Sequence, residues 1–197
     1  MNILIAPKED SYFYFRPDST LIRSLDEYYL PDFVEQIEFT PILYIKTLKP
    51  GKAVAKRFVT RYLDSFGFGS LLYPTLSNEL NDNNAHQDFV SNSLDYTTII
   101  PLDKFKIECL GELDNTGVLA DKFVRPTFKI NDTEISKDLI IPSLDNILER
   151  IANISEYYSF KIGDFICFPL TNKLKLKLGD IITLSIENKT LTRVLIK

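Results

Sequence analysis

Short β-prone runs separated by turn signals recur along almost the whole chain, and they constrain the fold more than any other feature. The runs are rich in Ile, Val, Phe, Tyr and Thr, the residue types that favour strands. They lie at residues 38–48, 68–73, 97–100, 123–130, 165–168, 181–187 and 190–196. The sequence therefore predicts an α+β protein that is mainly β.

Turn residues stand where these strands have to reverse. Asn131-Asp132 and Asn188-Lys189 each separate two alternating segments, so we expect a tight hairpin at both places. Two Lys-x-Gly-Asp segments, at residues 161–164 and 177–180, each precede a β run, as turns with a glycine at positive φ do. The last strand is therefore expected to be paired.

Two segments carry the periodicity of helices. In residues 53–66, large apolar side chains recur every fourth residue, and Gly67 follows as a possible cap. A second helix is expected to begin after Ser143, a good N-cap residue, and to end near Tyr157 or Tyr158. Residues 77–88 form the most polar stretch and are expected to be a mobile loop.

Length and composition limit the class of protein. A chain of 197 residues, 45% hydrophobic and 25% charged, suits one soluble domain spanning residues 1–197 that needs no disulfides. No apolar run is long enough for a membrane span, and residues 1–8 resemble a first strand more than a signal peptide, so we expect a cytoplasmic protein away from membranes. The net charge of -4 argues against nucleic acid as a partner. Cys109 and Cys167 are expected to be reduced, buried thiols.

Five segments, in order, resemble motifs of the fumarylacetoacetate hydrolase family. Residues 154–166 resemble its Ile-Ser-x-aromatic-aromatic-Thr-Leu-x-x-Gly-Asp segment, and residues 177–180 resemble the Lys-x-Gly-Asp turn before its closing hairpin. Residues 15–21 are similar to its substrate-side strand, residues 31–43 to its Glu-x-Glu strand, and Gly67-Phe68-Gly69 to the entry of its metal-bearing strand. The resemblance covers nearly the whole chain and implies a mixed β-sandwich roll of that family's C-terminal type, with two main helices.

The family's metal ligands are the residues that this sequence lacks. In the family, a Glu-x-Glu pair and an Asp on the next strand hold Mg²⁺ or Mn²⁺, because a hard cation needs anionic oxygen ligands. The resemblance places Thr40, Ile42 and Leu71 at these positions. Two hydrocarbons and one neutral hydroxyl cannot supply that charge, so no metal cofactor is expected. Ile42 and Leu71 are expected to fill the site, each contributing roughly 1.5 to 3 kcal/mol if fully buried.

Other motif positions are also changed. Residues 5–14 contain no counterpart of the family's early His, and residues 92–95 keep the Asp of its Lys-x-Phe-Asp motif, as Asp95, but not the Lys. Residues 167–170, Cys-Phe-Pro-Leu, stand where the family has its substrate-binding Thr-Gly-Thr-Pro loop. The resemblance therefore implies the fold without implying the activity.

A few residues remain as candidates for a site. His86 and Asp95 are weak catalytic candidates, against the commoner roles of a solvated loop histidine and a turn-capping aspartate. Arg16 is the best candidate to bind a substrate carboxylate, the alternative being an ion pair with a nearby acid at a strand edge. Lys173, which alternates with leucines up to residue 178, is interpreted as part of the solvent face of an amphipathic strand.

The leading hypothesis is a catalytically degenerate member of the family, a pseudoenzyme with a binding or assembly role. As the family's members associate in pairs, we expect a homodimer, or a subunit that partners an active paralogue. The alternative is an active hydrolase, hydratase or isomerase that acts on 2-oxo acid or acylpyruvate substrates through a rearranged site.

Overall fold

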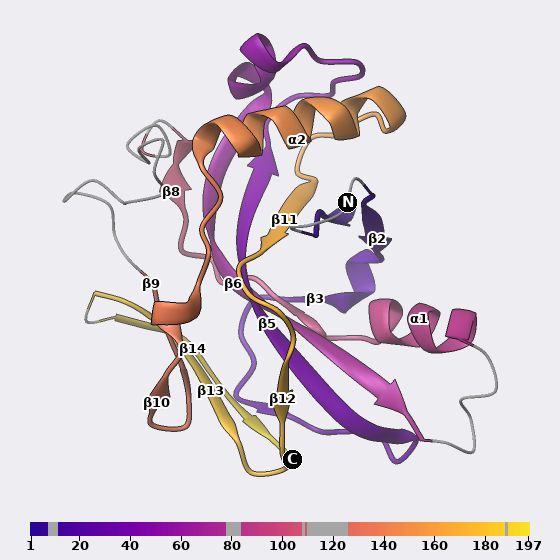
Figure 1. Ribbon diagram of the computed structural model, residues 1–197, viewed down its shortest axis with the longest axis vertical. Coiled ribbons are helices and arrows are strands. Elements are labelled where there is room, and N and C mark those ends of the chain that lie inside the picture. Colours follow the sequence, from indigo (N-terminus) through magenta and orange to yellow (C-terminus); the bar gives the residue numbers. More distant parts are fainter. Residues whose placement is uncertain (8–11, 78–83, 108, 110–125, 188) are drawn as a thin grey trace.

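Two long antiparallel strands form the centre of the molecule. β5 (Val34–Thr47) and β6 (Leu63–Leu76) pair along almost their full lengths, from Val34 opposite Leu76 to Thr47 opposite Leu63. Figure 1 shows them running side by side through the middle of the computed structural model, which describes residues 1–7, 12–77, 84–107, 109, 126–187 and 189–197. Their length makes this pair the scaffold on which the rest of the larger sheet is built.

The larger sheet has nine strands, among the described residues, and mixed strand directions. Its main path runs in the order β2 (Tyr14–Arg16), β1 (Ile3–Ile5), β11 (Phe165–Pro169), β5, β6, β7 (Thr98–Ile99) and β3 (Leu21–Ile22). β12 (Leu174–Leu176) also pairs with β5, and β8 (Phe105–Lys106) pairs with β6. β1 lies parallel to β11, with Ile3 opposite Phe165, so the first strand pairs with a strand that lies far along the sequence.

The smaller sheet collects the C-terminal strands. Its five strands lie in the order β10 (Thr133–Glu134), β9 (Pro126–Ile130), β13 (Ile181–Ile186), β14 (Lys189–Ile196) and β4 (Glu27–Tyr28). β9 and β10 form the expected hairpin, in which Asn131 has a φ of 53°. β13 and β14 form the expected C-terminal hairpin, although residue 188 lies outside the described residues. Both paired strands that the turn residues predict are confirmed.

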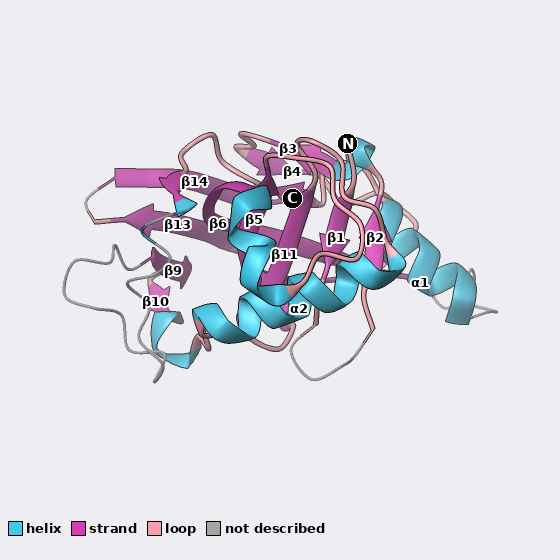
Figure 2. Cartoon of the chain, turned by 90° about the horizontal axis from the view of Figure 1, so that it is seen from above, coloured by secondary structure: helices cyan, strands magenta, loops and turns pink. Residues whose placement is uncertain are grey.

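The second predicted helix is also confirmed. α2 (Leu144–Tyr157) begins after Ser143, whose Oγ accepts a hydrogen bond from the backbone N–H of Asn146 at 3.3 Å, as an N-cap does. Its buried face, Ile147, Ile151 and Ile154, packs into the main core. Figure 2 shows α2 lying across one side of the strands.

The first predicted helix is wrong. Residues 56–62 form a 3-10 helix, η2 (Lys56–Tyr62), and the chain then enters β6 at Leu63, so Phe66 and Gly67 lie in a strand. From Phe66 to Gly69 aromatic residues alternate with glycines, which is the period of a strand. Gly67 is needed there because a Cβ would lie 2.5 Å from the hydroxyl oxygen of Tyr44 on β5. Pairing with β5 outweighs the four-residue spacing.

The prediction of a loop at residues 77–88 is also wrong in its second part. α1 (Asn84–Ser93) begins inside this range and packs against β6 and β2, while residues 78–83 lie outside the described residues. Two further short helices are η1 (Asp18–Thr20) and η4 (Ser136–Asp138). The α+β, mainly β class is confirmed, with α1 in place of the helix expected earlier in the chain.

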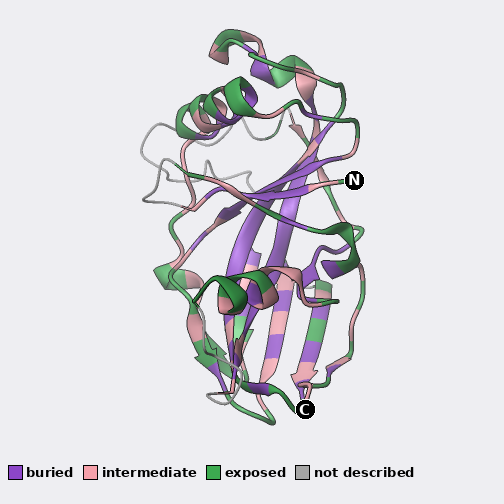
Figure 3. Cartoon of the chain, turned by 90° about the vertical axis from the view of Figure 1, so that its right-hand side faces the viewer, coloured by how far each residue is buried: buried purple, intermediate pink, exposed green. Residues whose placement is uncertain are grey.

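The larger sheet buries apolar side chains on both faces. Phe39, Leu43 and Ile45 of β5 point into the main core, which also receives α2 and the smaller sheet. Residues on the other face form a second apolar cluster, made of Ile3, Ile5, Ile42, Tyr44, Leu71, Tyr73, Ile100, Phe165 and Cys167. Figure 3 shows the central strands as the most continuously buried part of the chain.

Three smaller predictions have clear outcomes. Gly163 and Gly179, in the two Lys-x-Gly-Asp turns, have φ values of 83° and 88°. Both cysteines are free, but only Cys167 is buried, and Cys109 is exposed because its segment does not join a buried strand. Among the described residues, none of the helices combines the length and the apolar character needed to cross a membrane.

Candidate functional site

A cleft of about 740 Å³ opens on the sheet face that carries the second apolar cluster. Its floor comes from the sheet, with Tyr14 of β2, Thr40 of β5 and Tyr73 of β6. Asp88 of α1 and Lys173, which precedes β12, line it from the sides. Five segments that are distant in sequence therefore meet at one concave surface, which is where small-molecule sites usually lie.

Of the three positions that the resemblance assigned to metal ligands, only Thr40 lies at the cleft. Thr40 lines the cleft, while Ile42 and Leu71 lie fully buried in the second apolar cluster. Their side chains share a cluster because alternate residues of β5 and β6 project to this same face. Both side chains are therefore buried among hydrocarbon, and that they fill a former metal site stays a prediction. That these positions correspond to metal ligands stays a prediction.

These residues do not fit a divalent cation. Mg²⁺ and Mn²⁺ are held by carboxylates and other oxygen ligands, and neither Ile42 nor Leu71 has an oxygen in its side chain. Thr40 offers one neutral hydroxyl, and it is 1% exposed. Within the described residues, no group of three or more His, Cys, Asp or Glu side chains is placed to hold a metal ion.

Arg16 is buried beside the cleft, with its guanidinium engaged by the protein. Its Nη1 donates to the backbone oxygen of Thr97 at 3.1 Å, and its Nη2 donates to that of Leu72 at 3.0 Å. Weaker bonds reach the Thr97 and Thr98 hydroxyls and the backbone oxygen of Ser91. The expected ion pair with an acid is not formed with any described residue, and a direct role in binding substrate stays a prediction.

Arg16 nevertheless shapes the floor through Tyr73. Its guanidinium carbon lies 4.4 Å from the centre of the Tyr73 ring, and the Lys173 Nζ lies 4.1 Å from the same ring centre. Such positions favour a cation–π attraction. Burial raises the pKa of Tyr73, so its phenol stays neutral even with two cations close by.

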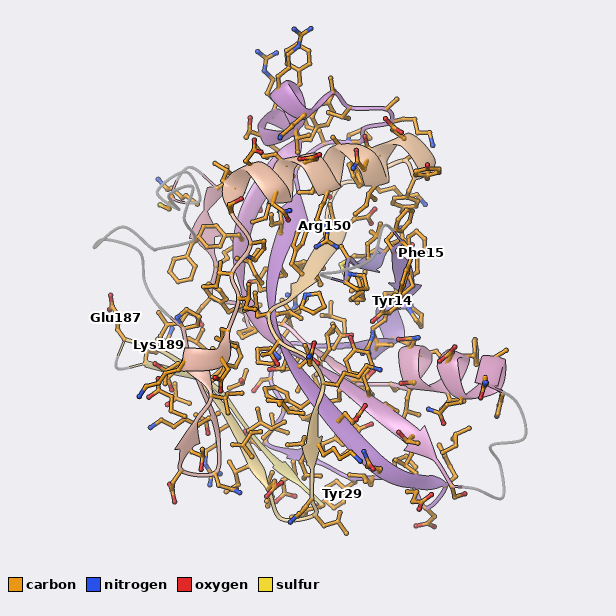
Figure 4. The ribbon with its side chains drawn as sticks, in the orientation of Figure 1. Tyr14, Phe15, Tyr29, Arg150, Glu187 and Lys189 are labelled. Carbon is orange, nitrogen blue, oxygen red and sulfur yellow. The ribbon has the colours of Figure 1, made fainter. Side chains whose placement is uncertain are left out.

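Tyr73 is joined to Tyr14 by a hydrogen bond between the two phenol oxygens, which are 2.9 Å apart. Burial also raises the pKa of Tyr14, with the nearby Tyr73 as a further cause. Figure 4 labels Tyr14 on β2. Tyr14 and Tyr73 thus place neutral hydroxyl groups on the floor of the cleft.

Figure 4 also labels Arg150 on α2, whose guanidinium donates to the backbone oxygen of Pro7 at the edge of the cleft.

The two weak catalytic candidates lie elsewhere. His86 is exposed on α1, and Asp95 is exposed in the turn that follows α1. Neither lines the cleft. His86 and Asp95 therefore do not join Thr40 at the cleft, although Asp95 and Arg16 both act electrostatically on Tyr28.

Several cleft residues were not predicted as site residues. Asp88 and Asp138 both line the cleft, and nothing in their local sequence marks them. Lys173 has an exposed side chain, as predicted, but its ammonium packs on Tyr73 instead of pointing away. One signal was available: the resemblance put a substrate loop at residues 167–170, and Pro169 and Leu170 do line the cleft.

Comparison with solved structures identifies the fold. The chain superposes on a protein of the fumarylacetoacetate hydrolase family from Yersinia pestis with a TM-score of 0.70 and 16% identity, covering 100% of this chain and 92% of that one. Fumarylpyruvate hydrolase from Pseudomonas aeruginosa, solved with Mn²⁺ and pyruvate, gives a TM-score of 0.70 at 10% identity, covering 100% and 90%. 5-Carboxymethyl-2-hydroxymuconate delta-isomerase from Mycobacterium smegmatis gives a TM-score of 0.69 at 16% identity, covering 100% of this chain and 77% of that one.

Sequence comparison adds nothing to this likeness. No family model matches the chain, and no curated protein matches it. Identities of 10% to 16% show the fold alone. The chain therefore has the fold of fumarylacetoacetate hydrolase family proteins, and the β-roll expected from the resemblance is confirmed.

Proposed function

We propose that this chain is a catalytically degenerate protein with the fumarylacetoacetate hydrolase fold, which binds a small molecule in the cleft without a metal ion. The observation that carries the proposal is the burial of Ile42 and Leu71, both 0% exposed, on the same sheet face as a cleft that stays open. A pseudoenzyme of this kind keeps the concave surface of the fold and loses the charged ligands beside it.

Electrostatics supports the loss of the metal. A divalent cation gives up its hydration shell only where anionic ligands replace it. The cations of Arg16 and Lys173 both lie against the Tyr73 ring, while Glu38, opposite Tyr73 on β5, and Asp88 are the carboxylates that act on Lys173. The two cations would repel Mg²⁺ or Mn²⁺, and the missing ligands oppose binding as well.

The shape and lining support a binding role. About 740 Å³ lies within the range of small-molecule sites, and Tyr14, Tyr73, Ile140 and Leu170 supply apolar surface beside hydroxyl and charged groups. This combination of concave shape, apolar surface and a few polar groups suits a small-molecule ligand.

A metal titration tests the proposal. A specific site occupied at a hundred times its Kd would stabilise the fold by about 2.7 kcal/mol, which raises Tm by roughly 5 to 10 °C for a chain of this length. We expect MgCl₂ and MnCl₂ to raise Tm no more than NaCl of equal ionic strength does. A saturable rise with either divalent ion would contradict the proposal.

An active enzyme is the second candidate function, and one observation favours it. A solved structure with the same fold holds Mn²⁺ and pyruvate, and another is an isomerase. By this alternative the chain is a hydrolase, hydratase or isomerase acting on 2-oxo acid or acylpyruvate substrates through a rearranged site. Turnover of an acylpyruvate that a chelator abolishes and Mn²⁺ restores would establish it and end the binding proposal.

A further inference from the structure

One buried polar group of the cleft, the hydroxyl of Thr40, has no hydrogen-bond partner among the described residues. Thr40 Oγ1 is buried, lines the cleft, and forms no hydrogen bond within the described part of the chain. An unpaired buried hydroxyl is unfavourable by about 1 to 3 kcal/mol, and such groups are rare in folded proteins. Thr40 therefore indicates that a polar atom of a ligand completes the floor.

The tyrosine pair beside Thr40 offers a second donor. Tyr14 and Tyr73 have two phenolic hydrogens between them, and only one is used in the bond that joins their oxygens. Since burial keeps both phenols neutral, the other hydrogen is available to an acceptor in the cleft. Thr40 and this pair therefore suit an oxygen acceptor such as a carboxylate.

The cations around Tyr73 favour an anionic group at the same place. Neither Arg16 nor Lys173 forms an ion pair with any described residue, and Arg16 Nε is buried without a hydrogen-bond partner there. The pKa of Lys173 is lowered overall, mainly by burial and also by the charge of Arg16. The carboxylates of Glu38 and Asp88 oppose this shift by raising the pKa. A ligand carboxylate on the floor would offset the charge of both cations.

The sides of the cleft carry the opposite charge. Asp88 on α1 and Asp138 on η4 are both exposed and both line the cleft, and neither forms an ion pair with a described residue. An anion that filled the whole cleft would be repelled by these two carboxylates. A ligand with a positive group at its outer end would be attracted by them.

We propose that the ligand of the cleft is a small zwitterion, with a carboxylate beside Thr40, Tyr73 and Lys173 and an ammonium group at Asp88 or Asp138, the acidic residues that line the cleft. This inference rests on the proposed metal-independent binding function and names the class of ligand for it. Amino acids and other aminoalkanoates have this combination of charges. The presence of both kinds of charge in one cleft is the basis of the selectivity.

Matched ligands test the inference by isothermal titration calorimetry. γ-Aminobutyrate is compared with butyrate and butylamine, and ε-aminocaproate with caproate and hexylamine, so that each zwitterion has partners lacking one charge. We expect at least one zwitterion to bind about tenfold or more tightly than either of its partners. Plain carboxylates that bind as tightly as the zwitterions would overturn the zwitterion inference and leave a binding cleft in place.

Variants assign the two charges to the two regions. Lys173→Met is expected to weaken zwitterion binding about tenfold or more, whereas Lys175→Met, at an exposed residue of β12 outside the cleft, is expected to leave it unchanged. The double variant Asp88→Asn/Asp138→Asn is expected to reduce zwitterion binding to the level of the plain carboxylate. Failure of both ligand series to bind wild-type protein overturns the inference, while metal-dependent turnover would overturn the proposed function separately.

Discussion

The second apolar cluster and the floor of the cleft share one face of one sheet, yet they have opposite character. Around Ile42 and Leu71 the packing is closed and made of hydrocarbon. Around Thr40, two residues from Ile42 on β5, the surface is polar and hollow, and Tyr73 belongs both to the apolar cluster and to this floor. The difference teaches that hydrocarbon at Ile42 and Leu71 closes one part of this face and leaves the neighbouring part open.

The largest expected effect comes from putting charge into the closed region. Leu71→Asp places a carboxylate among hydrocarbon groups, and we expect it to lower the free energy of unfolding by at least about 3 kcal/mol, measured by urea denaturation. The control is Leu178→Asp at a side chain that is 70% exposed, where a change within about 0.5 kcal/mol is expected. Equal stability of the two variants would show that the region around Leu71 is not closed.

Alkaline pH is expected to weaken both regions through their phenols. Burial raises the pKa of Tyr14 in the cleft and of Tyr44 in the closed cluster, and it raises the pKa of Tyr28 to about 12. Above about pH 10 the unfolded chain releases phenolic protons that the folded chain retains, so stability falls with rising pH. Each such phenol contributes a slope of about 1.4 kcal/mol per pH unit between its two pKa values.

Urea denaturation at several values between pH 9 and pH 11 measures this slope. Tyr14→Phe removes one raised phenol and should reduce the slope, whereas Tyr157→Phe at an exposed side chain serves as the control. Stability that is independent of pH in this range would mean that water reaches these phenols in the folded protein.

The smallest expected effect compares two buried threonines. Thr20 Oγ1 donates to the backbone oxygen of Pro17 at 2.8 Å and lies 3.0 Å from Thr98 Oγ1, whereas Thr40 Oγ1 has no partner among the described residues. We expect Thr20→Val to lower the free energy of unfolding by about 1 kcal/mol. Thr40→Val should leave it unchanged or raise it while weakening ligand binding, which calorimetry and denaturation together measure. If Thr40→Val lowers the free energy of unfolding as much as Thr20→Val does, the hydroxyl of Thr40 already has a hydrogen-bond partner in the unliganded protein.

Local signals in the sequence predicted the parts of the fold that depend on local interactions. Ser143 and the apolar spacing after it predicted α2, and the turn at Asn131 predicted a hairpin. The helix expected at residues 53–66 failed because β6 is held by β5, a long-range ladder that single-segment periodicity does not reveal. The order of motifs along the chain was the better guide to the overall fold.

The site was less predictable than the fold, for the same reason. The resemblance indicated Thr40 and the segment of Pro169 and Leu170, which line the cleft. Asp88, Asp138 and Lys173 come from three other segments, and only the folded chain brings them together. Arg16 was marked as a substrate ligand because it is a strand arginine near the family's pocket, whereas the structure surrounds its guanidinium with backbone oxygens.

The position of β1 has a consequence for synthesis of the protein. β1 lies between β2 and β11, and its partner residues on β11 begin at Phe165, so one edge of this strand stays unpaired until most of the chain has left the ribosome. During translation, the apolar strand of Ile3, Leu4 and Ile5 therefore stays exposed to solvent until β11 is synthesised. In the folded chain all three residues are fully buried. Chaperone binding to nascent chains is therefore expected to concentrate on the first strand.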